Sequence, residues 1–254
     1  MGKIIAVTNQ KGGVGKTTTS VNLSACLAEA GRRVLLVDVD PQGNATSGLG
    51  CAEEGKNTVY DVLLGECAAK DAVIPTKFGS LSVMPSGIEL AGAEIEMVGI
   101  DNRELLLKRA LKTVSGDYDY LLIDCPPSLS LLTVNALTAA ESVLIPIQCE
   151  YYALEGVGQL INTVKLMRKK LNPALAIEGI LLTMFDSRTN LCAQVVQEVR
   201  SHFPEEVFET MIPRNVRLSE APSYGVPIHL YDARSTGAQA YRALSRELIE
   251  RNEG

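Results

Sequence analysis

Long apolar runs and histidine-centred catalytic motifs are absent from this sequence of 254 residues. The longest apolar runs, such as residues 34–37 and 179–182, have the length of a strand, whereas a membrane-spanning helix needs about 20 apolar residues. The histidines, His202 and His229, lie in no pattern typical of a Ser-His-Asp or Cys-His catalytic set. The chain enters an expected strand within its first residues, so we expect no signal peptide. We therefore expect neither a membrane-spanning protein nor a hydrolase of the triad type.

Closely spaced cysteine pairs are absent as well. The six cysteines are scattered along the chain, with no CxxC pair and no His-rich neighbourhood. This distribution argues against a structural metal site and is typical of buried thiols in a reducing compartment. We therefore expect a cytoplasmic protein.

An excess of positive charge is also missing. Lys and Arg number 24 against 30 Asp and Glu, which gives a formal net charge of -6. The chain as a whole is therefore not expected to be drawn to nucleic acid or to anionic lipid. Any such binding must come from a local cluster of Lys and Arg.

Short apolar runs alternate with helix-like patterns along the whole chain, and their continuity is typical of parallel strands covered on both faces. We expect strands at residues 3–8, 33–38, 81–84, 118–124, 142–147, 178–184 and 207–212. We expect helices at residues 16–30, 102–114, 131–140, 154–171, 193–203 and about 235–251. No linker rich in Pro, Gly or Ser interrupts the pattern, so residues 1–254 are predicted to form one doubly wound α/β domain, with a mostly parallel sheet and helices on both faces. Residues 41–60 and 85–102 are the least regular, and we expect mobile loops there.

A glycine-rich loop lies between the first expected strand and the first expected helix. It consists of Lys11, Gly12, Gly13, Val14, Gly15, Lys16, Thr17 and Thr18. Small residues here bring backbone N–H groups around phosphate oxygens, and the positive end of the helix dipole points at them. In a P-loop the lysine bridges the β and γ phosphates, and the following hydroxyl ligates Mg²⁺. A tight turn with a chance lysine is the alternative, but it does not explain the whole motif in this context. The sequence therefore predicts a Mg²⁺-dependent ATPase of the P-loop class.

Two expected strands end in aspartates. Asp38 and Asp40 follow one buried run, and Asp124 follows another. Ligands of open α/β sheets bind at the carboxyl edge, where these residues are carried. A carboxylate beside a triphosphate is unfavourable unless it faces a cation, so the pattern implies Mg²⁺. An aspartate at the end of one strand commonly caps the next helix. Capping alone is the less favoured interpretation when two strands beside a P-loop both end in aspartates.

The phosphate loop departs from the common P-loop pattern because Lys11 precedes its first glycine, and in this it resembles the loop of the ParA/MinD group of ATPases. The resemblance to chromosomal ParA proteins, also called Soj, covers nearly the whole chain. Beyond the loop it is carried by residues 38–50, 123–128, 148–156 and 212–222. The last two stretches are specific to this branch, whereas the loop is shared with MinD and other relatives.

The resemblance implies roles for the matching residues. Lys11 reaches across a two-fold axis to the partner subunit's nucleotide, Asp40 orients the attacking water, and Asp124 is the Walker B aspartate that holds Mg²⁺ through water. With Thr17, both aspartates form the expected Mg²⁺ site, while Asp38 holds either the loop or a Mg²⁺-bound water. Three further residues are implied to lie at the nucleotide: Glu150 near it, and Pro213 and Asn215 beside the adenine base.

The resemblance also implies a cycle. ATP closes a sandwich homodimer, the dimer binds DNA without sequence preference, and a ParB-type partner stimulates hydrolysis and release, which drives chromosome or plasmid segregation at the nucleoid. The candidates for a basic DNA surface are Arg188, Arg214 and Arg217. A lysine-rich run at residues 165–170 ranks below them, because charge runs on helices are usually solvated faces. Local pairing of these arginines with carboxylates such as Asp186 or Glu220 is the competing interpretation.

Three other functions use related loops. A membrane-surface ATPase like MinD needs a basic amphipathic C-terminal helix, whereas residues 243–254 carry mixed charge and are typical of a helix packed on its own domain. A metabolic ligase or small-molecule kinase needs an acceptor-substrate pocket, for which the sequence shows no residues. An iron-sulfur reductase needs paired cluster-ligating cysteines, a pattern to which Cys51, Cys125 and Cys149 are not matched.

Overall fold

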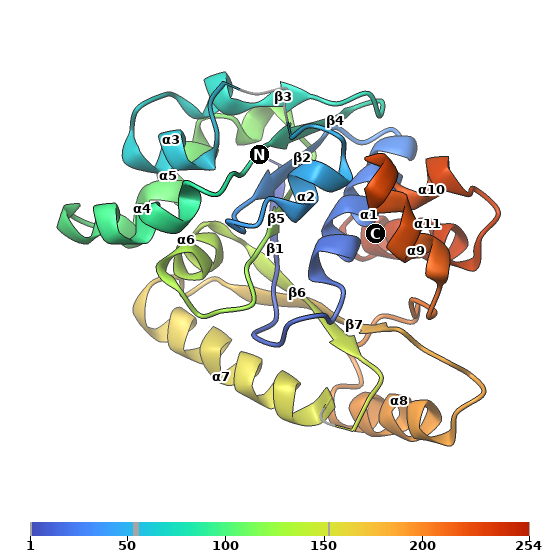
Figure 1. Ribbon diagram of the computed structural model, residues 1–254. Helices are drawn as coiled ribbons and strands as arrows, with labels where there is room; N and C mark the ends of the chain where they lie inside the picture. The colour runs from blue at the N-terminus through green and yellow to red at the C-terminus, as the bar shows by residue number, and fades with distance from the viewer. Residues whose placement is uncertain (1, 53–55, 152, 254) are drawn as a thin grey trace.

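The structure, a computed structural model, describes residues 2–52, 56–151 and 153–253 (Figure 1). Residues 53–55, within a stretch expected to be irregular, and Tyr152, within the 148–156 motif, lie outside the described residues. One sheet runs through the described part of the chain, and helices lie on both sides of it.

The sheet has seven strands in the order β3-β4-β2-β5-β1-β6-β7. The strands are β1 (Lys3–Val7), β2 (Val34–Asp38), β3 (Ile74–Pro75), β4 (Leu81–Met84), β5 (Tyr120–Asp124), β6 (Ser142–Gln148) and β7 (Ala176–Thr183). Neighbouring strands are parallel except β3 and β4, which pair antiparallel at the edge. The register places Asp38 opposite Asp124, and Asp124 opposite Val7 on its other side. Both strand-end aspartates and the start of the phosphate loop therefore meet at one edge of the sheet.

Helices cover both faces of the sheet. They are α1 (Lys16–Glu29), α2 (Asn44–Gly48), α3 (Val59–Leu64), α4 (Leu90–Glu96), α5 (Leu106–Lys112), α6 (Leu131–Ala139), α7 (Ala153–Lys170), α8 (Asn190–His202), α9 (Val216–Glu220), α10 (Ile228–Tyr231) and α11 (Thr236–Glu253). Short 3-10 turns span Ala69–Ala72, Met97–Gly99, Arg103–Leu105, Ser115–Asp117 and Ala221–Tyr224. Helices α3 to α8 pack on one face, and α1, α2 and α9 to α11 pack on the other (Figure 1).

The strands are apolar on both sides because both faces are covered. In β1, Ile4 and Ala6 join the apolar cluster under α5 to α8, whereas Ile5 and Val7 join the cluster under α1 and α11. Successive side chains of a strand point to opposite faces, so both sets must be apolar when both faces are buried. The predicted fold class, a doubly wound and mostly parallel α/β sheet, is confirmed.

The prediction of a strand at residues 207–212 is wrong. This segment runs beside β7 and makes an isolated bridge from Val207 to Ile180, but it forms no strand. The N–H groups of Glu209 and Thr210 donate to the carboxylate of Glu247 in α11, at 2.8 and 2.9 Å. The last helix therefore takes hydrogen bonds that a further strand would have used.

The stretches expected to be irregular, residues 41–60 and 85–102, contain α2, the start of α3, and α4. Helix α3 begins with a capping box, in which Tyr60 N–H donates to Thr58 Oγ1 at 3.2 Å and Thr58 N–H donates to the Asp61 carboxylate at 2.6 Å. Two predicted helix starts were also displaced, because α5 begins at Leu106 after a 3-10 turn and α8 begins at Asn190. The helices that the sequence did not predict in these stretches, α2, α3 and α4, are short and have no long apolar face.

The C-terminal helix α11 packs on its own domain, as expected, and its neighbour there is α1. Tyr241, Leu244 and Leu248 are buried in the apolar cluster on that face. The guanidinium of Arg242 pairs with Glu29 of α1 at 2.7 Å. Within the part of the chain that the structure describes, every helix is too short or too polar to cross a lipid bilayer.

Candidate active site

The phosphate loop is a tight connection between β1 and α1. Gly13 and Gly15 have φ values of 75° and 89°, in the left-handed region that residues with a Cβ rarely adopt. Gly15 precedes α1 without a side-chain cap, so the first N–H groups of the helix remain available to an anion. Thr183 at the end of β7 ties the loop down by donating from Oγ1 to the carbonyl of buried Val14 at 2.8 Å. The loop opens on a groove of about 330 Å³, whose lining includes Gly12, Gly13, Gly15, Lys16, Thr17 and Thr18.

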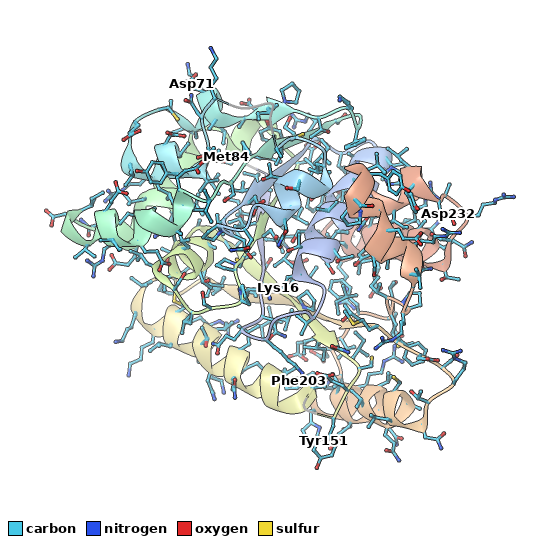
Figure 2. All side chains as sticks on the ribbon, in the orientation of Figure 1. Lys16, Asp71, Met84, Tyr151, Phe203 and Asp232 are labelled. Carbon is cyan, nitrogen blue, oxygen red and sulfur yellow. The ribbon has the colours of Figure 1, made fainter. Side chains whose placement is uncertain are left out.

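Both lysines of the loop have partners within the chain. Lys16, labelled in Figure 2, is 7% exposed and donates from Nζ to the carbonyl of Lys11 at 3.0 Å. The Lys11 ammonium forms an ion pair with Glu150, in the segment that follows β6. The Lys11 N–H donates to Oδ1 of Asn9 at 3.0 Å, which fixes the backbone at the start of the loop. The structure thus brings Lys11, Lys16 and Glu150 together at the phosphate loop.

Thr17 and Asp124 are hydrogen-bonded at the base of the groove. Thr17 Oγ1 donates to Oδ2 of Asp124 at 2.8 Å, and Ser20 Oγ donates to Oδ1 at 2.7 Å. Asp40, which is 8% exposed, also lines the groove. Mg²⁺ prefers oxygen ligands and usually keeps several waters, while one or two carboxylates and phosphate oxygens hold it. A hydroxyl and a carboxylate side by side at an open groove fit that kind of binding. No three His, Cys, Asp or Glu side chains among the described residues gather as a metal-binding group.

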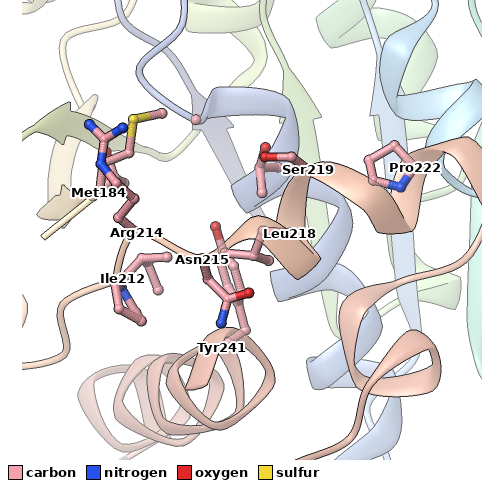
Figure 3. Close-up of a pocket in the computed structure, with 12 residues that line it drawn as sticks. Met184, Ile212, Arg214, Asn215, Leu218, Ser219, Pro222 and Tyr241 are labelled. Atoms are coloured by element: carbon pink, nitrogen blue, oxygen red, sulfur yellow. The ribbon is translucent and has the colours of Figure 1, made fainter. Parts of the chain in front are cut away.

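A second pocket, of about 320 Å³, continues the phosphate groove (Figure 3). The two cavities share Gly15, Thr18 and Met184. The pocket is also lined by Pro213 and Asn215, the two residues that the family resemblance places beside an adenine base. A phosphate groove that runs into a partly apolar pocket has the shape that a nucleotide requires.

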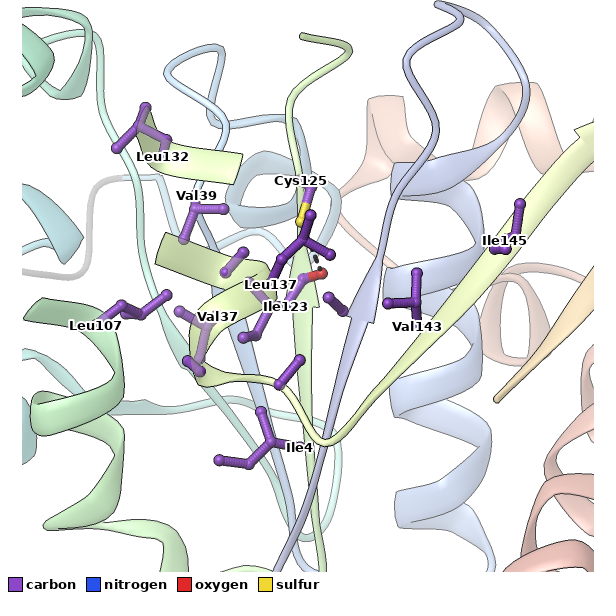
Figure 4. Close-up of a cluster of buried hydrophobic side chains, with 14 of the residues drawn as sticks. Ile4, Val37, Val39, Leu107, Ile123, Cys125, Leu132, Leu137, Val143 and Ile145 are labelled. Carbon is purple, nitrogen blue, oxygen red and sulfur yellow. Dashed lines mark hydrogen bonds between the residues drawn. The ribbon is translucent and has the colours of Figure 1, made fainter. Parts of the chain in front are cut away.

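Burial makes the carboxylates of this edge electrostatically unfavourable without a cation. Asp38 and Asp124 are fully buried and lie opposite each other on β2 and β5. Burial raises the pKa of Asp124, and the nearby charge of Asp38 raises it further. Burial lowers the pKa of Lys16, although the charge of Asp124 opposes this effect. Ile123 and Cys125, on either side of Asp124, belong to the apolar cluster beneath the site (Figure 4). A bound cation would relieve the repulsion between these carboxylates.

The arginines expected at a DNA surface are exposed, but two of them are paired. Arg188 donates from Nε and Nη2 to the two carboxylate oxygens of Asp186, at 2.9 and 2.7 Å. Arg217 pairs with Glu220 at 2.8 Å. Arg214 lines the second pocket instead. The competing interpretation, local ion pairing, therefore describes the geometry of Arg188 and Arg217 in this structure.

Several polar residues at this edge were missed from the sequence. Ser20 had a readable signal, because it lies one helical turn after Thr17 and shares a face of α1 with it. Thr46 and Ser86, which hold the segment around Asp40, come from α2 and from the loop after β4. No spacing in the sequence connects those segments. Met184 at the junction of the two cavities has a φ of 52°, which is uncommon for a residue other than glycine.

Comparison with known proteins gives a consistent result. The profile of a family described as an AAA domain matches residues 2–177. The sporulation initiation inhibitor protein Soj of Bacillus subtilis is 62% identical over 249 residues, which cover 98% of each chain. The chromosome partitioning protein ParA of Myxococcus xanthus is 57% identical over 253 residues, which cover 99% of this chain and 89% of that protein. A solved structure of cobyrinic acid a,c-diamide synthase from Mycobacterium smegmatis with bound ADP and magnesium has a TM-score of 0.87 at 41% identity, covering 100% of this chain and 96% of the other.

A mostly parallel sheet with a phosphate loop before its first helix, and with aspartates at the ends of two adjacent strands, defines a P-loop ATPase. The Soj and ParA relatives named above share 62% and 57% of their residues with this chain, and the synthase shares 41%. The chain belongs to the Soj/ParA family of chromosome-partitioning ATPases.

Proposed function

We propose that this chain is an ATP-driven switch that partitions chromosomal or plasmid DNA. With Mg²⁺ and ATP it forms a sandwich homodimer, the dimer binds DNA without sequence preference, and hydrolysis stimulated by a ParB-type partner releases the DNA. The observation that carries the proposal is the continuity of the phosphate groove with the base pocket, beside a Lys11 side chain that remains 43% exposed. Residues 1–254 act as one ATPase domain, in the cytoplasm and associated with the nucleoid.

The residues around the groove have separate roles in ATP hydrolysis. Lys16 exchanges the carbonyl of Lys11 for the β and γ phosphates, and the N–H groups at the start of α1 surround the phosphate oxygens. Thr17 would hold Mg²⁺ directly and Asp124 would hold it through water. The bound ion would neutralise charge on the triphosphate. Asp40 orients the attacking water at the open side of the groove. Phosphoryl transfer needs mainly positioning and charge neutralisation, which this set of residues can supply.

Different residues contact the base and the second subunit. Pro213 and Asn215 border the adenine in the second pocket. Lys11 leaves Glu150, which lies near the nucleotide, and crosses the two-fold axis to the partner subunit's phosphates. A Cβ added at Gly12 would meet no atom within 4 Å, so the loop offers an open face to an approaching subunit.

The DNA surface is assigned to Arg188, Arg214 and Arg217. The ion pair of Arg188 with Asp186 is compatible with this role, because the Arg188 side chain is 85% exposed and solvent-exposed ion pairs contribute little to stability. A DNA phosphate can therefore replace the carboxylate. The α7 side chains Lys165, Lys169 and Lys170 are exposed and form no ion pair within the described residues, so they provide the comparison surface. Dimerisation sets two copies of either patch side by side and multiplies the phosphate contacts.

The proposal is tested by sedimentation with plasmid DNA and, separately, with vesicles of anionic lipid, each with ATP, ADP or no nucleotide. We expect the chain to pellet with DNA and ATP only, and to stay in the supernatant with vesicles. Pelleting with vesicles but not with DNA would show a membrane-surface ATPase of the MinD type instead. Failure to pellet with either, under saturating ATP, would contradict the switch and favour a metabolic enzyme.

The same assay distinguishes between the two candidate DNA-binding surfaces. Charge reversal of Arg188 and Arg217 to Glu is compared with reversal of Lys165 and Lys169 to Glu. Each pair changes the net charge of a subunit by the same amount, so the general electrostatic effect is matched. The assignment requires the arginine variant to lose much more DNA binding than the lysine variant.

A further inference from the structure

A closed ring of hydrogen bonds holds the backbone of Asp40. Its N–H donates to Oδ1 of Asp38 at 3.2 Å, and its carbonyl accepts from Ser86 Oγ at 2.8 Å. The Ser86 N–H donates to Oγ1 of Thr46 at 3.0 Å. The Thr46 hydroxyl and N–H both donate to Oδ2 of Asp38, at 2.8 and 2.9 Å, which closes the ring. The end of β2, the start of α2 and the loop after β4 are thereby joined around one peptide.

The ring is buried, and Asp40, itself only 8% exposed, is among the residues that line the phosphate groove. Asp38 is 0% exposed, Thr46 is 2% exposed and Ser86 is 9% exposed. Buried hydrogen bonds are costly to leave unmade, so the ring rigidifies the segment that contains it. Gly43 packs closely here as well, since an added Cβ would lie 3.2 Å from the carbonyl of Ser86. The backbone of Asp40 is thus fixed on both sides while its side chain remains at the phosphate groove.

We infer that Asp38, Thr46 and Ser86 are positioning residues for ATP hydrolysis, which hold the Asp40 carboxylate where it orders the attacking water. None of the three is among the described residues that line the phosphate groove or the base pocket, so they act through Asp40. The inference rests on the role proposed above for Asp40. It assigns Asp38, whose role was left open by the sequence, to the loop and not to a Mg²⁺-bound water.

Geometry and chemistry favour an effect on the rate more than on affinity. In the proposed mechanism α1 and the phosphate loop bind the phosphates, and none of the ring's hydrogen bonds described above involves either of them. The catalytic water depends on the placement of one carboxylate, and a shift of about 1 Å in a positioned group can cost roughly 10²-fold in rate. Loss of one hydroxyl in the ring is therefore expected to lower kcat while the affinity for ATP changes little.

The test compares Thr46→Val with Thr46→Ser. Valine keeps the shape of threonine but removes the hydroxyl that donates to Asp38 and accepts from Ser86, whereas serine keeps it. We expect Thr46→Val to bind ATP within about threefold of the wild-type Kd and to hydrolyse it roughly ten- to a hundredfold more slowly. Thr46→Ser should restore kcat to within about threefold. Ser47→Ala is the matched control, because it removes an exposed hydroxyl one residue further along and should leave both constants unchanged.

Ser86→Ala is a second, independent test of the inference if Thr46→Val does not fold. It removes only the hydrogen bond to the Asp40 carbonyl, and we expect a fall in kcat of roughly tenfold with little change in Kd. Turnover is measured without DNA or partner, so failure of DNA binding does not affect the result. Wild-type turnover in both Thr46→Val and Ser86→Ala overturns the inference. Asp40→Ala is assayed beside them: if that variant also turns over normally, the role of Asp40 itself is wrong.

Discussion

The ammonium of Lys11 forms an ion pair with the carboxylate of Glu150 in the same chain. In the proposed dimer Lys11 contacts the partner subunit's nucleotide, so the intrachain pair and the cross-subunit contact exclude each other. The two side chains are 43% and 32% exposed, and such pairs contribute only about 0.2–1 kcal/mol. The pair is thus weak enough for a triphosphate to displace it, but it opposes dimerisation until then.

Removing this competition should favour the dimer. Glu150→Gln keeps the size of the side chain and removes its charge, so Lys11 is no longer held within its own chain. We expect half-maximal dimerisation at a roughly two- to fivefold lower ATP concentration, which corresponds to the strength of an exposed pair. Light scattering during an ATP titration, in an Asp40→Ala background that blocks hydrolysis, measures this. An unchanged or weaker dimer would show that Glu150 does not restrain Lys11.

The phosphate loop should separate ATP binding from dimerisation. Gly12 has open space around it, so Gly12→Val is expected to fold normally and to bind ATP while its side chain blocks the approach of the second subunit. Lys11→Ala is expected to bind ATP as a monomer because the cross-subunit cation is missing. Sizing with saturating ATP and hydrolysis blocked is the measurement. A monomeric wild type under these conditions would remove the basis for both expectations.

Lys16 and Asp40 should fail in different ways. Asp40→Ala is expected to bind ATP and dimerise but to lose roughly 10²-fold or more in turnover, because the water is no longer ordered. Lys16→Gln is expected to raise the Kd for ATP at least about tenfold, because a buried cation at the phosphates is lost. Equilibrium binding and single-turnover hydrolysis distinguish the two. Near-normal turnover in Asp40→Ala would exclude it from the mechanism and turn attention to Asp38.

The sequence was sufficient for the parts of the site that lie on regular elements. The phosphate loop, Asp38 and Asp124 could be placed because each follows a continuous apolar strand, and parallel strands end at a common edge. The ring around Asp40 could not, because Ser86 comes from a loop 46 residues away and its role depends on tertiary packing. The capping box at Thr58 was readable and was overlooked. The roles taken from the resemblance, such as those of Pro213 and Asn215, remain predictions.

The ionised carboxylate of Asp124, which is proposed to hold Mg²⁺, should lower the stability of the nucleotide-free protein. Burial and the charge of Asp38 raise its pKa in the folded, nucleotide-free protein above the ordinary carboxyl value of about 3.9. The folded state therefore holds the proton more tightly than the unfolded state, so the stability contributed by this group is present at low pH and is lost as pH rises from about 4 through the raised pKa.

Asp124→Asn removes that pH-dependent loss. We expect the nucleotide-free variant to have a higher Tm than the wild type at pH 8, by a few degrees, with the difference shrinking toward pH 5. With Mg²⁺ and ATP the order should reverse, since only the wild type can hold the ion. Thermal unfolding at several pH values, with and without Mg²⁺-ATP, tests this. A variant less stable than the wild type at pH 8 without nucleotide contradicts the electrostatic account.

The central claim is that ATP switches on DNA binding by joining two subunits, and the affinity of the Asp40→Ala variant for DNA tests it most directly. The variant is titrated with two duplexes of unrelated sequence over a salt series, with ATP, with ADP and without nucleotide. The account predicts binding with ATP only, equal for both duplexes, with log K falling against log salt by about 0.9 for each phosphate neutralised. Reversal of Arg188 and Arg217 to Glu should weaken it at least about tenfold. Equal binding without nucleotide, or no binding by the ATP-bound dimer, would contradict the account.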